Sequence, residues 1–366
     1  MVVDCNAKNP KAGPKGGGKN PKAGGKGGRK NPKAGGKGKG GGAKNPKAGG
    51  KGGSAKNPGA GGKGEMQNSR CAVSSTLLSI AFDPAFQVPI QADFYSCATT
   101  KDAPLLIITP GAFIPKTEYS MTAETIAHNG EYSVMVLEHN LPFGARGAPA
   151  NFATPVDIQS AVAYAQDNAE SLGLDAERIV LVGHSFGGSS VLFFMNGICP
   201  PPLCGSAPVF FPSDTSPIKA VVNFGHTLTI IDQQGQIVAY DDELKNYGFP
   251  YAFVNGAGDF VNSVELEGGL IIDGSFERVL PAAAFGSIEN ADHYSICNSF
   301  PADSLRPDAK STAVREDQVQ GVVDALDFWI TETIQGINAG ACDNFVGLGK
   351  NPTSSFAVAR CKLVLE

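Results

Sequence analysis

The hexapeptide GHSFGG, at residues 183–188, places a serine among glycines directly after the apolar run RIVLV. A strand, then G-x-S-x-G, then a helix is the pattern of a nucleophile elbow, a strained turn that projects a serine hydroxyl above a sheet. We therefore predict that Ser185 is a nucleophile. Side chains at Gly183 and Gly187 would collide with neighbouring elements, and Gly188 lets the following helix approach closely. The free amides at the start of that helix favour negative charge beside the serine.

A serine hydroxyl is a poor nucleophile at neutral pH and needs a base, usually a histidine. The chain has five histidines. His128 falls in an expected helix, His139 comes too early in the chain, His184 lies inside the elbow, and His226 follows the next strand. His293, in the segment ENADHYSI, follows the last apolar run and is the predicted base.

The carboxylate that orients the base is expected between the serine and the histidine in chain order. Asp259, in the segment NGAGDF, directly follows an apolar run, so we predict that it is the acid. Glu265 is the nearest competitor, and Asp292 adjoins His293 but is expected to point elsewhere. Four further carboxylates lie in polar stretches that no core strand precedes: Asp232, Asp241, Asp242 and Asp273.

An oxyanion formed on the serine needs two backbone N–H donors. The first is expected from Phe186, the residue after the nucleophile. The second is expected from the segment PGAF at residues 110–113, where Gly111 frees the chain to turn its next amides inward. Ala112 or Phe113 would then donate, and the sequence does not separate them. An ordinary Pro-Gly turn would have the same sequence.

The residues that could do this chemistry must be held at the ends of strands. Apolar runs alternate with stretches of helical spacing, which predicts an α/β fold with a mostly parallel sheet and helices on both faces. The expected strands are 104–111, 132–140, 178–183, 218–225, 250–256 and 282–290, and the expected helices are 117–130, 154–173, 187–197 and 315–334. Residues 71–96 lack helical spacing and are expected to add antiparallel edge strands. Ligands bind such sheets at the carboxyl ends of the strands.

The segments PGAF, ETIAHNGEYSVMVLEHN, GHSFGG and ADHYSIC resemble, across roughly residues 100–335, the α/β-hydrolase superfamily. Within it they look like the branch of chlorophyllases, platelet-activating-factor acetylhydrolases and cutinase-like polyester hydrolases. The resemblance implies the α/β-hydrolase fold, with Ser185 as nucleophile, His293 as base and Phe186 as oxyanion donor. Some members place the acid after the strand that follows the elbow. Here that strand offers Asn223, which moves the role to Asp259.

The implied chemistry is acyl transfer to water through an acyl-enzyme, without a metal or organic cofactor. Phe113 and Phe186 make the neighbourhood of the elbow apolar, so we expect a carboxylic ester with an apolar acyl or alcohol group. Phe193 and Phe194 in VLFFMNG are explained equally well by core packing. The alternative is a non-catalytic binding or matrix protein that has the hydrolase fold.

The first 64 residues differ in composition from the rest of the chain. They hold 15 Lys, Arg29 and the single acid Asp4, a net charge of +15, so the remaining residues carry −20 of the total of −5. Without apolar surface to bury, nothing offsets the entropy of ordering such a segment. We expect residues 1–64 to be a disordered basic tail that contacts polyanions, or a solubilising spacer, and residues 65–366 to form one hydrolase domain.

The cysteines give an expectation about compartment. The segment CPPPLC favours a disulfide between Cys199 and Cys204, and Cys342 and Cys361 flank a Gly/Pro-rich segment where a second is expected. Disulfides indicate an oxidising compartment, so a secreted or organellar location is favoured. Buried free thiols would give the same count, and no signal peptide or membrane span is visible in the sequence. Oligomeric state is not predicted. The remaining cysteines are Cys5, Cys71, Cys97 and Cys297.

Overall fold

The computed structural model describes residues 71–83, 88–129, 132–139, 153–200, 204, 208–226, 229–231, 237–240, 250–259, 282–300, 315–334 and 356–363. The expected basic tail over residues 1–64, its boundary at residue 65, and the pairing that involves Cys342 lie outside these residues. Glu265 and the carboxylates at 232, 241, 242 and 273 also lie outside them.

Nine strands form one sheet in the order β1-β2-β4-β3-β5-β8-β11-β12-β13. All neighbouring strands from β4 to β12 run parallel, while β1, β2 and β13 join through antiparallel pairs. This is the predicted α/β-hydrolase fold, and residues 71–96 supply the expected antiparallel strands at one edge of the sheet, with β1 outermost. The bounds are β1 Val73–Asp83, β2 Val88–Cys97, β3 Ala103–Thr109, β4 Ser133–His139, β5 Leu174–His184, β8 Ile218–Phe224, β11 Tyr251–Gly256, β12 Ala282–Ile288 and β13 Phe356–Leu363.

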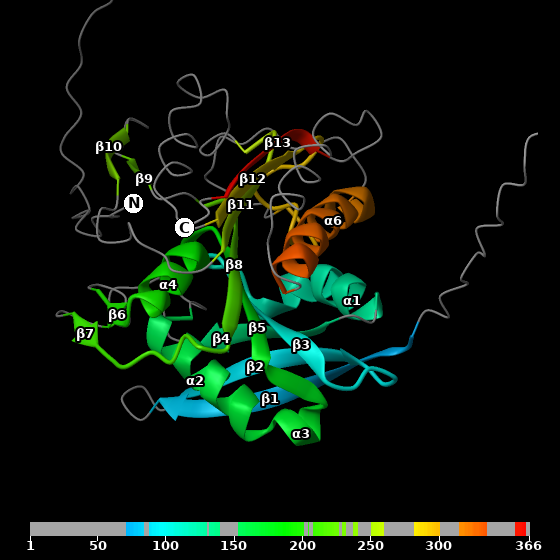
Figure 1. Cartoon of the computed structure of the whole chain (residues 1–366), viewed down its shortest axis with the longest axis vertical. Coiled ribbons are helices and arrows are strands. Elements are labelled where there is room, and N and C mark those ends of the chain that lie inside the picture. Colours follow the sequence, from blue (N-terminus) through cyan, green and yellow to red (C-terminus); the bar gives the residue numbers. More distant parts are fainter. Residues whose placement is uncertain are drawn as a thin grey trace, which may run out of the picture. The chain divides into compact units, whose positions relative to one another are not determined.

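Helices cover both faces of the sheet, as the alternating sequence predicts (Figure 1). On one face, α1 and α6 pack together against a core that includes Ile126, Val322 and Trp329. On the other, α2 and α4 close a second core with Ile158 and Leu192. The helices are η1 Lys116–Tyr119, α1 Ser120–His128, α2 Pro155–Asp167, α3 Ala169–Leu172, α4 Phe186–Met195 and α6 Arg315–Ile334. The central strands are therefore buried on both sides, which explains their continuous apolar sequence.

The start of α2 shows how local sequence sets an element. Thr154 Oγ1 accepts a hydrogen bond from the Asp157 amide, and the Asp157 carboxylate accepts one from the Thr154 amide. Pro155 occupies the first helical position, where its missing N–H costs nothing. This cap fixes where α2 begins to pack against α4.

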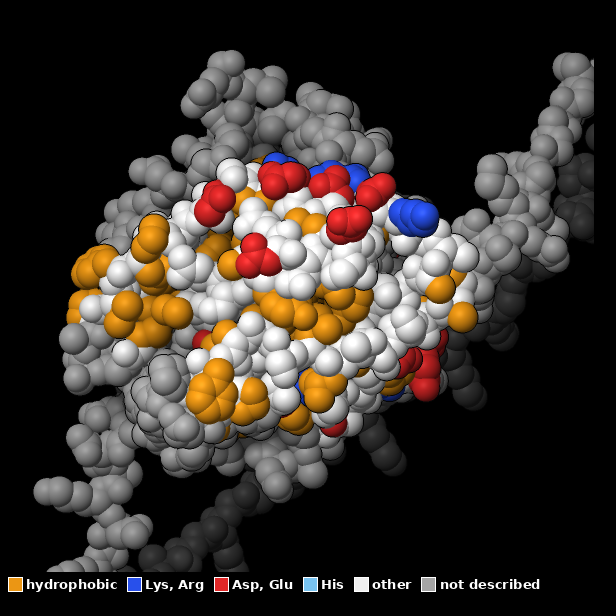
Figure 2. Space-filling view, turned by 90° about the horizontal axis from the view of Figure 1, so that it is seen from below, with side chains coloured by type: hydrophobic (Ala, Val, Ile, Leu, Met, Phe, Trp, Pro, Cys, Tyr) orange, Lys and Arg blue, Asp and Glu red, His pale blue; other side chains and the backbone are white. Residues whose placement is uncertain are grey.

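Two disulfides join described cysteines. Cys199–Cys204 was expected, whereas Cys71–Cys97, which ties the start of β1 to the end of β2, was not. Cys297 is a buried free thiol. Cys199 ends the short strand β6 (Ile198–Cys199), which pairs with β7 (Val209–Phe210), and both residues of β7 are exposed. Figure 2 shows hydrophobic side chains at the side of the domain on which β6 and β7 lie in Figure 1.

Two further strands, β9 (Thr229–Ile231) and β10 (Ile237–Tyr240), pair with each other. None of the described helices is long and apolar enough to cross a membrane.

Candidate active site

Every predicted site residue follows the carboxyl end of a strand in the central sheet. Ser185 follows β5, and the segment with Ala112 and Phe113 follows β3. Asp259 lies three residues beyond β11, and His293 lies five residues beyond β12. Because parallel strands end along the same edge of a sheet, one edge gathers side chains that are up to 181 positions apart in the sequence.

The turn at Ser185 has the strained backbone of a nucleophile elbow. Ser185 has φ 50° and ψ −121°, and residues other than glycine rarely adopt a positive φ. Ser185 directly precedes α4. A methyl group at Gly183 would lie 2.5 Å from Gly188 Cα, and one at Gly187 would lie 2.2 Å from the Thr109 carbonyl oxygen. The expected collisions at both glycines are therefore confirmed. The serine is half-buried at the start of α4.

His293 and Asp259 form a buried pair. His293 Nδ1 lies 2.9 Å from Asp259 Oδ2, and both side chains are at most 2% exposed. Their two loops are joined by backbone hydrogen bonds, from the Ala257 amide to the Ile288 carbonyl and from the Gly258 amide to the Ala291 carbonyl. A carboxylate that accepts from Nδ1–H leaves Nε2 as the nitrogen that can take a proton. Two of the three predicted residues thus interact directly.

The end of β8 connects this pair to the elbow. The Ser185 amide donates to the Phe224 carbonyl at 2.9 Å. The next residue, Gly225, has φ +61°, and a methyl group there would lie 2.7 Å from His293 Nδ1. Within the described residues, no hydrogen bond joins Ser185 Oγ to the His293 ring. In enzymes without bound substrate this contact is often long and tightens in the Michaelis complex.

The segment after β3 lies against the elbow. A methyl group added at Gly111 would lie 3.1 Å from His184 Nδ1 and 3.2 Å from Ser185 Cβ. The Ile114 amide donates to the Gly111 carbonyl, which closes a turn whose central residues are Ala112 and Phe113. Phe113 has φ 65°, as the third position of a type II turn requires, and its side chain is 57% exposed.

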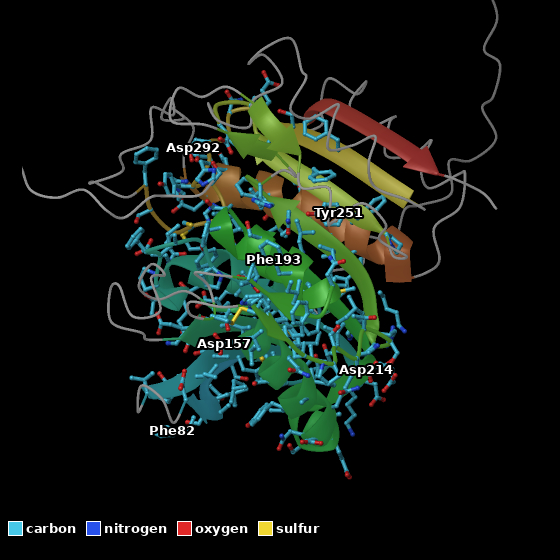
Figure 3. All side chains as sticks on the ribbon, turned by 90° about the vertical axis from the view of Figure 1, so that its left-hand side faces the viewer. Phe82, Asp157, Phe193, Asp214, Tyr251 and Asp292 are labelled. Carbon is cyan, nitrogen blue, oxygen red and sulfur yellow. A yellow bond between two sulfur atoms is a disulfide. The ribbon has the colours of Figure 1, made fainter. Side chains whose placement is uncertain are left out.

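The other carboxylate beside the histidine has structural partners. Asp292 accepts hydrogen bonds from the Tyr294 amide and the Ser295 hydroxyl, and lies 3.9 Å from the Arg315 guanidinium at the start of α6 (Figure 3). It therefore points away from the His293 ring, as expected. Asn223, where some resembling proteins have the acid, is buried and donates to the Tyr251 hydroxyl.

The elbow histidine makes contacts that the sequence analysis missed. His184 is fully buried; its Nδ1 lies 2.7 Å from the Tyr119 hydroxyl and its Nε2 lies 2.9 Å from the His293 carbonyl oxygen. The partners are 65 and 109 positions away in sequence, so no local pattern could have shown these bonds. The one sequence signal for a role of His184 is that it directly precedes the predicted nucleophile.

Comparison with protein families agrees with the fold. Residues 92–226 match the model of BD-FAE, a family of esterase-like α/β-hydrolase domains. The match spans β2 to His226 and includes Gly111 and Ser185, but it ends before Asp259 and His293. It supports the α/β-hydrolase superfamily and an esterase-like hydrolase domain, while the branch of chlorophyllases, platelet-activating-factor acetylhydrolases and cutinase-like enzymes stays a prediction. No curated protein matched the chain. Among the described residues, no cluster of three or more His, Cys, Asp or Glu could hold a metal ion.

Gly225→Ala is expected to lower kcat for ester hydrolysis by at least about 100-fold, because its methyl group would overlap His293 Nδ1 and Cε1 and displace the ring from Asp259. The measurement is steady-state hydrolysis of p-nitrophenyl butyrate beside urea unfolding. Gly173→Ala is the matched control, since Gly173 also has a positive φ of 67° but the nearest atom to its methyl group would be 3.8 Å away. Equal kcat losses in the two variants would contradict the prediction.

Proposed function

We propose that the chain is a serine hydrolase that cleaves carboxylic esters, with Ser185 as nucleophile, His293 as base and Asp259 as the residue that orients the base. The observation that carries this proposal is the buried His293–Asp259 pair, which packs closely against Gly225, next to the Phe224 carbonyl that accepts from the Ser185 amide. An esterase-like family match across the elbow supports the same reaction class.

In the proposed reaction, His293 Nε2 removes the hydroxyl proton of Ser185 as the oxygen attacks the ester carbonyl carbon. The tetrahedral oxyanion receives hydrogen bonds from the Phe186 amide and from the amide of Ala112 or Phe113. Collapse of the intermediate breaks the C–O bond, and the protonated His293 gives its proton to the leaving alcohol. Water, deprotonated by the same nitrogen, then releases the carboxylic acid from the acyl-enzyme.

The substrate is an ester with an apolar acyl or alcohol group. Phe113 presents more than half of its side chain to solvent from the turn that borders Ser185. Phe186, the residue after Ser185, packs with Phe193, Phe211 and the Cys199–Cys204 disulfide in a small apolar cluster. Apolar side chains next to the nucleophile favour hydrocarbon chains over sugars or charged peptides.

The first test is covalent labelling of the wild-type protein by a fluorescent fluorophosphonate, followed by mapping of the modified peptide. The expected result is one adduct on Ser185, because phosphonates react with activated serines. A folded protein that gives no adduct would overturn the proposal and favour the alternative, a binding protein with a hydrolase fold.

Phe113→Ala is expected to lower kcat/KM for p-nitrophenyl octanoate by about 10-fold while leaving p-nitrophenyl acetate nearly unchanged, because only the longer chain reaches the ring. Alanine replaces one non-glycine residue by another at positive φ, so the cost of the turn is similar. Leu77→Ala is the matched control, since Leu77 is also 57% exposed but lies on β1. An equal loss for both esters, or in both variants, would contradict this role.

A further inference from the structure

A buried chain of hydrogen bonds runs through His184, the residue before Ser185. It begins at the Gly111 amide, which lies 2.8 Å from the Tyr119 hydroxyl oxygen. It continues from Tyr119 to His184 Nδ1 at 2.7 Å, and ends with His184 Nε2 at 2.9 Å from the His293 carbonyl oxygen. Tyr119 and His184 are both fully buried. The chain therefore joins the turn after β3, the elbow and the loop that carries the base.

A neutral His184 gives the donors and acceptors of this chain one assignment, with the Cys297 thiol 4.0 Å from its Nδ1. The His293 carbonyl can only accept, so His184 Nε2 carries the proton and Nδ1 accepts. The Tyr119 hydroxyl therefore donates to Nδ1, and its oxygen accepts from the Gly111 N–H. Burial raises the pKa of Tyr119 well above its usual value, which keeps the hydroxyl protonated for this bond. The Gly111 N–H can only donate and the His293 carbonyl can only accept, so the two ends set the orientation of the side chains between them.

The Gly111 amide donates to the Tyr119 hydroxyl oxygen and is therefore not the amide that we assign to an oxyanion. The Ile114 amide donates to the Gly111 carbonyl. The amides of Ala112 and Phe113 lie between these two hydrogen-bonded amides in the turn. At the other end, the bond to the His293 carbonyl fixes the backbone of the base itself. The His184 and His293 rings are also in contact, with centroids 4.9 Å apart.

We propose that Tyr119 and His184 are positioning residues that hold the oxyanion turn and the His293 loop at a fixed spacing on either side of Ser185. This role rests on the proposed hydrolase function. Neither side chain is hydrogen-bonded to Ser185 Oγ or to the His293 ring; their hydrogen bonds go to the Gly111 amide and the His293 carbonyl. A displacement of about 1 Å in an oxyanion donor or in the base lowers the rate of reaction about 100-fold. Loss of one of these three hydrogen bonds is therefore expected to lower kcat.

The test compares Tyr119→Phe with wild type in p-nitrophenyl butyrate hydrolysis and in the rate of fluorophosphonate labelling. Loss of one hydroxyl is expected to lower kcat and the labelling rate about 10- to 100-fold, with KM within about 3-fold, because the substrate contacts remain while the donors and base move. Ser190→Ala is the matched control: its buried hydroxyl donates to the Ala153 carbonyl behind α4, away from both loops. Ser190→Ala is expected to lose comparable stability towards urea but to keep its kcat.

A second pair of variants keeps the test decisive where Tyr119→Phe folds poorly. His184→Gln and His184→Met have side chains of similar length, but only glutamine can both donate to the His293 carbonyl and accept from Tyr119. The glutamine variant is expected to retain at least about 10-fold more kcat than the methionine variant. Equal activity of these two variants, or a Tyr119→Phe kcat within about 2-fold of wild type, overturns the positioning role alone. A wild-type protein that is neither labelled nor active overturns the hydrolase function and this role with it.

Discussion

Ser185→Ala is expected to reduce kcat for p-nitrophenyl butyrate by about 10⁶-fold and to abolish fluorophosphonate labelling. The reason is that no acyl-enzyme can form without the hydroxyl, so any remaining rate comes from the oxyanion donors and binding alone. Alanine keeps the Cβ at a position whose φ is already 50°, and the turn should survive. The measurement is burst and steady-state kinetics on protein whose fold is checked by urea unfolding.

The matched control for that prediction is Ser189→Ala, which removes a half-buried hydroxyl four positions further along the same segment. It is expected to retain full labelling and kcat within about 2-fold, because Ser189 lies in α4 beyond the elbow. Labelling that persists in Ser185→Ala, or vanishes equally in Ser189→Ala, would show that the probe reports another serine. The proposed nucleophile would then be wrong.

The features most readily predicted from the sequence are those fixed by neighbouring residues. The elbow geometry follows from three glycines around one serine. A Cβ atom on any of these glycines would collide with the turn itself or with a neighbouring segment. The cap of α2 follows from a threonine and an aspartate three positions apart. The pairing of His293 with Asp259 was predicted from strand ends and chain order, because the carboxyl ends of parallel strands meet at one edge.

Long-range contacts without a repeating pattern were missed. The bond between Tyr119 and His184 joins residues 65 positions apart, and it depends on how η1 packs against the end of β5. The disulfide between Cys71 and Cys97 depends on the antiparallel register of β1 and β2, in which Val73 lies opposite Cys97. Strand β13 was missed because it pairs with β12 only after α6 has returned the chain to that edge of the sheet.

The same limit applies to the choice of the carboxylate from the sequence. Asp259 and Glu265 both follow β11, and distance along the chain does not say which one faces His293. The structure gives Asp259 a direct contact with Nδ1, but a catalytic role requires more than a hydrogen bond between buried groups. A substitution that changes the charge and hydrogen bonding of this group, but not its shape, is therefore the informative one.

Asp259→Asn is expected to lower kcat by about 10⁴-fold while leaving KM and the fold nearly unchanged. The carboxylate can only accept from Nδ1–H, which leaves Nε2 unprotonated and able to take the Ser185 proton. An asparagine amide can donate to Nδ1 instead, which stabilises the opposite tautomer and places a proton on the nitrogen that must act as base. The measurement is kcat and KM for p-nitrophenyl butyrate, with the fluorophosphonate labelling rate as a second readout of Ser185 reactivity.

Two control variants separate this effect from a general loss of buried charge. Asp292→Asn removes a buried carboxylate next to His293, one that accepts from Tyr294 and Ser295 and not from the imidazole, so it is expected to lower stability more than kcat. Glu265→Gln tests the competing acid and is expected to leave kcat within about 2-fold. If Glu265→Gln loses activity and Asp259→Asn keeps it, the acid is Glu265, and the buried Asp259–His293 contact holds the two loops together without orienting a base.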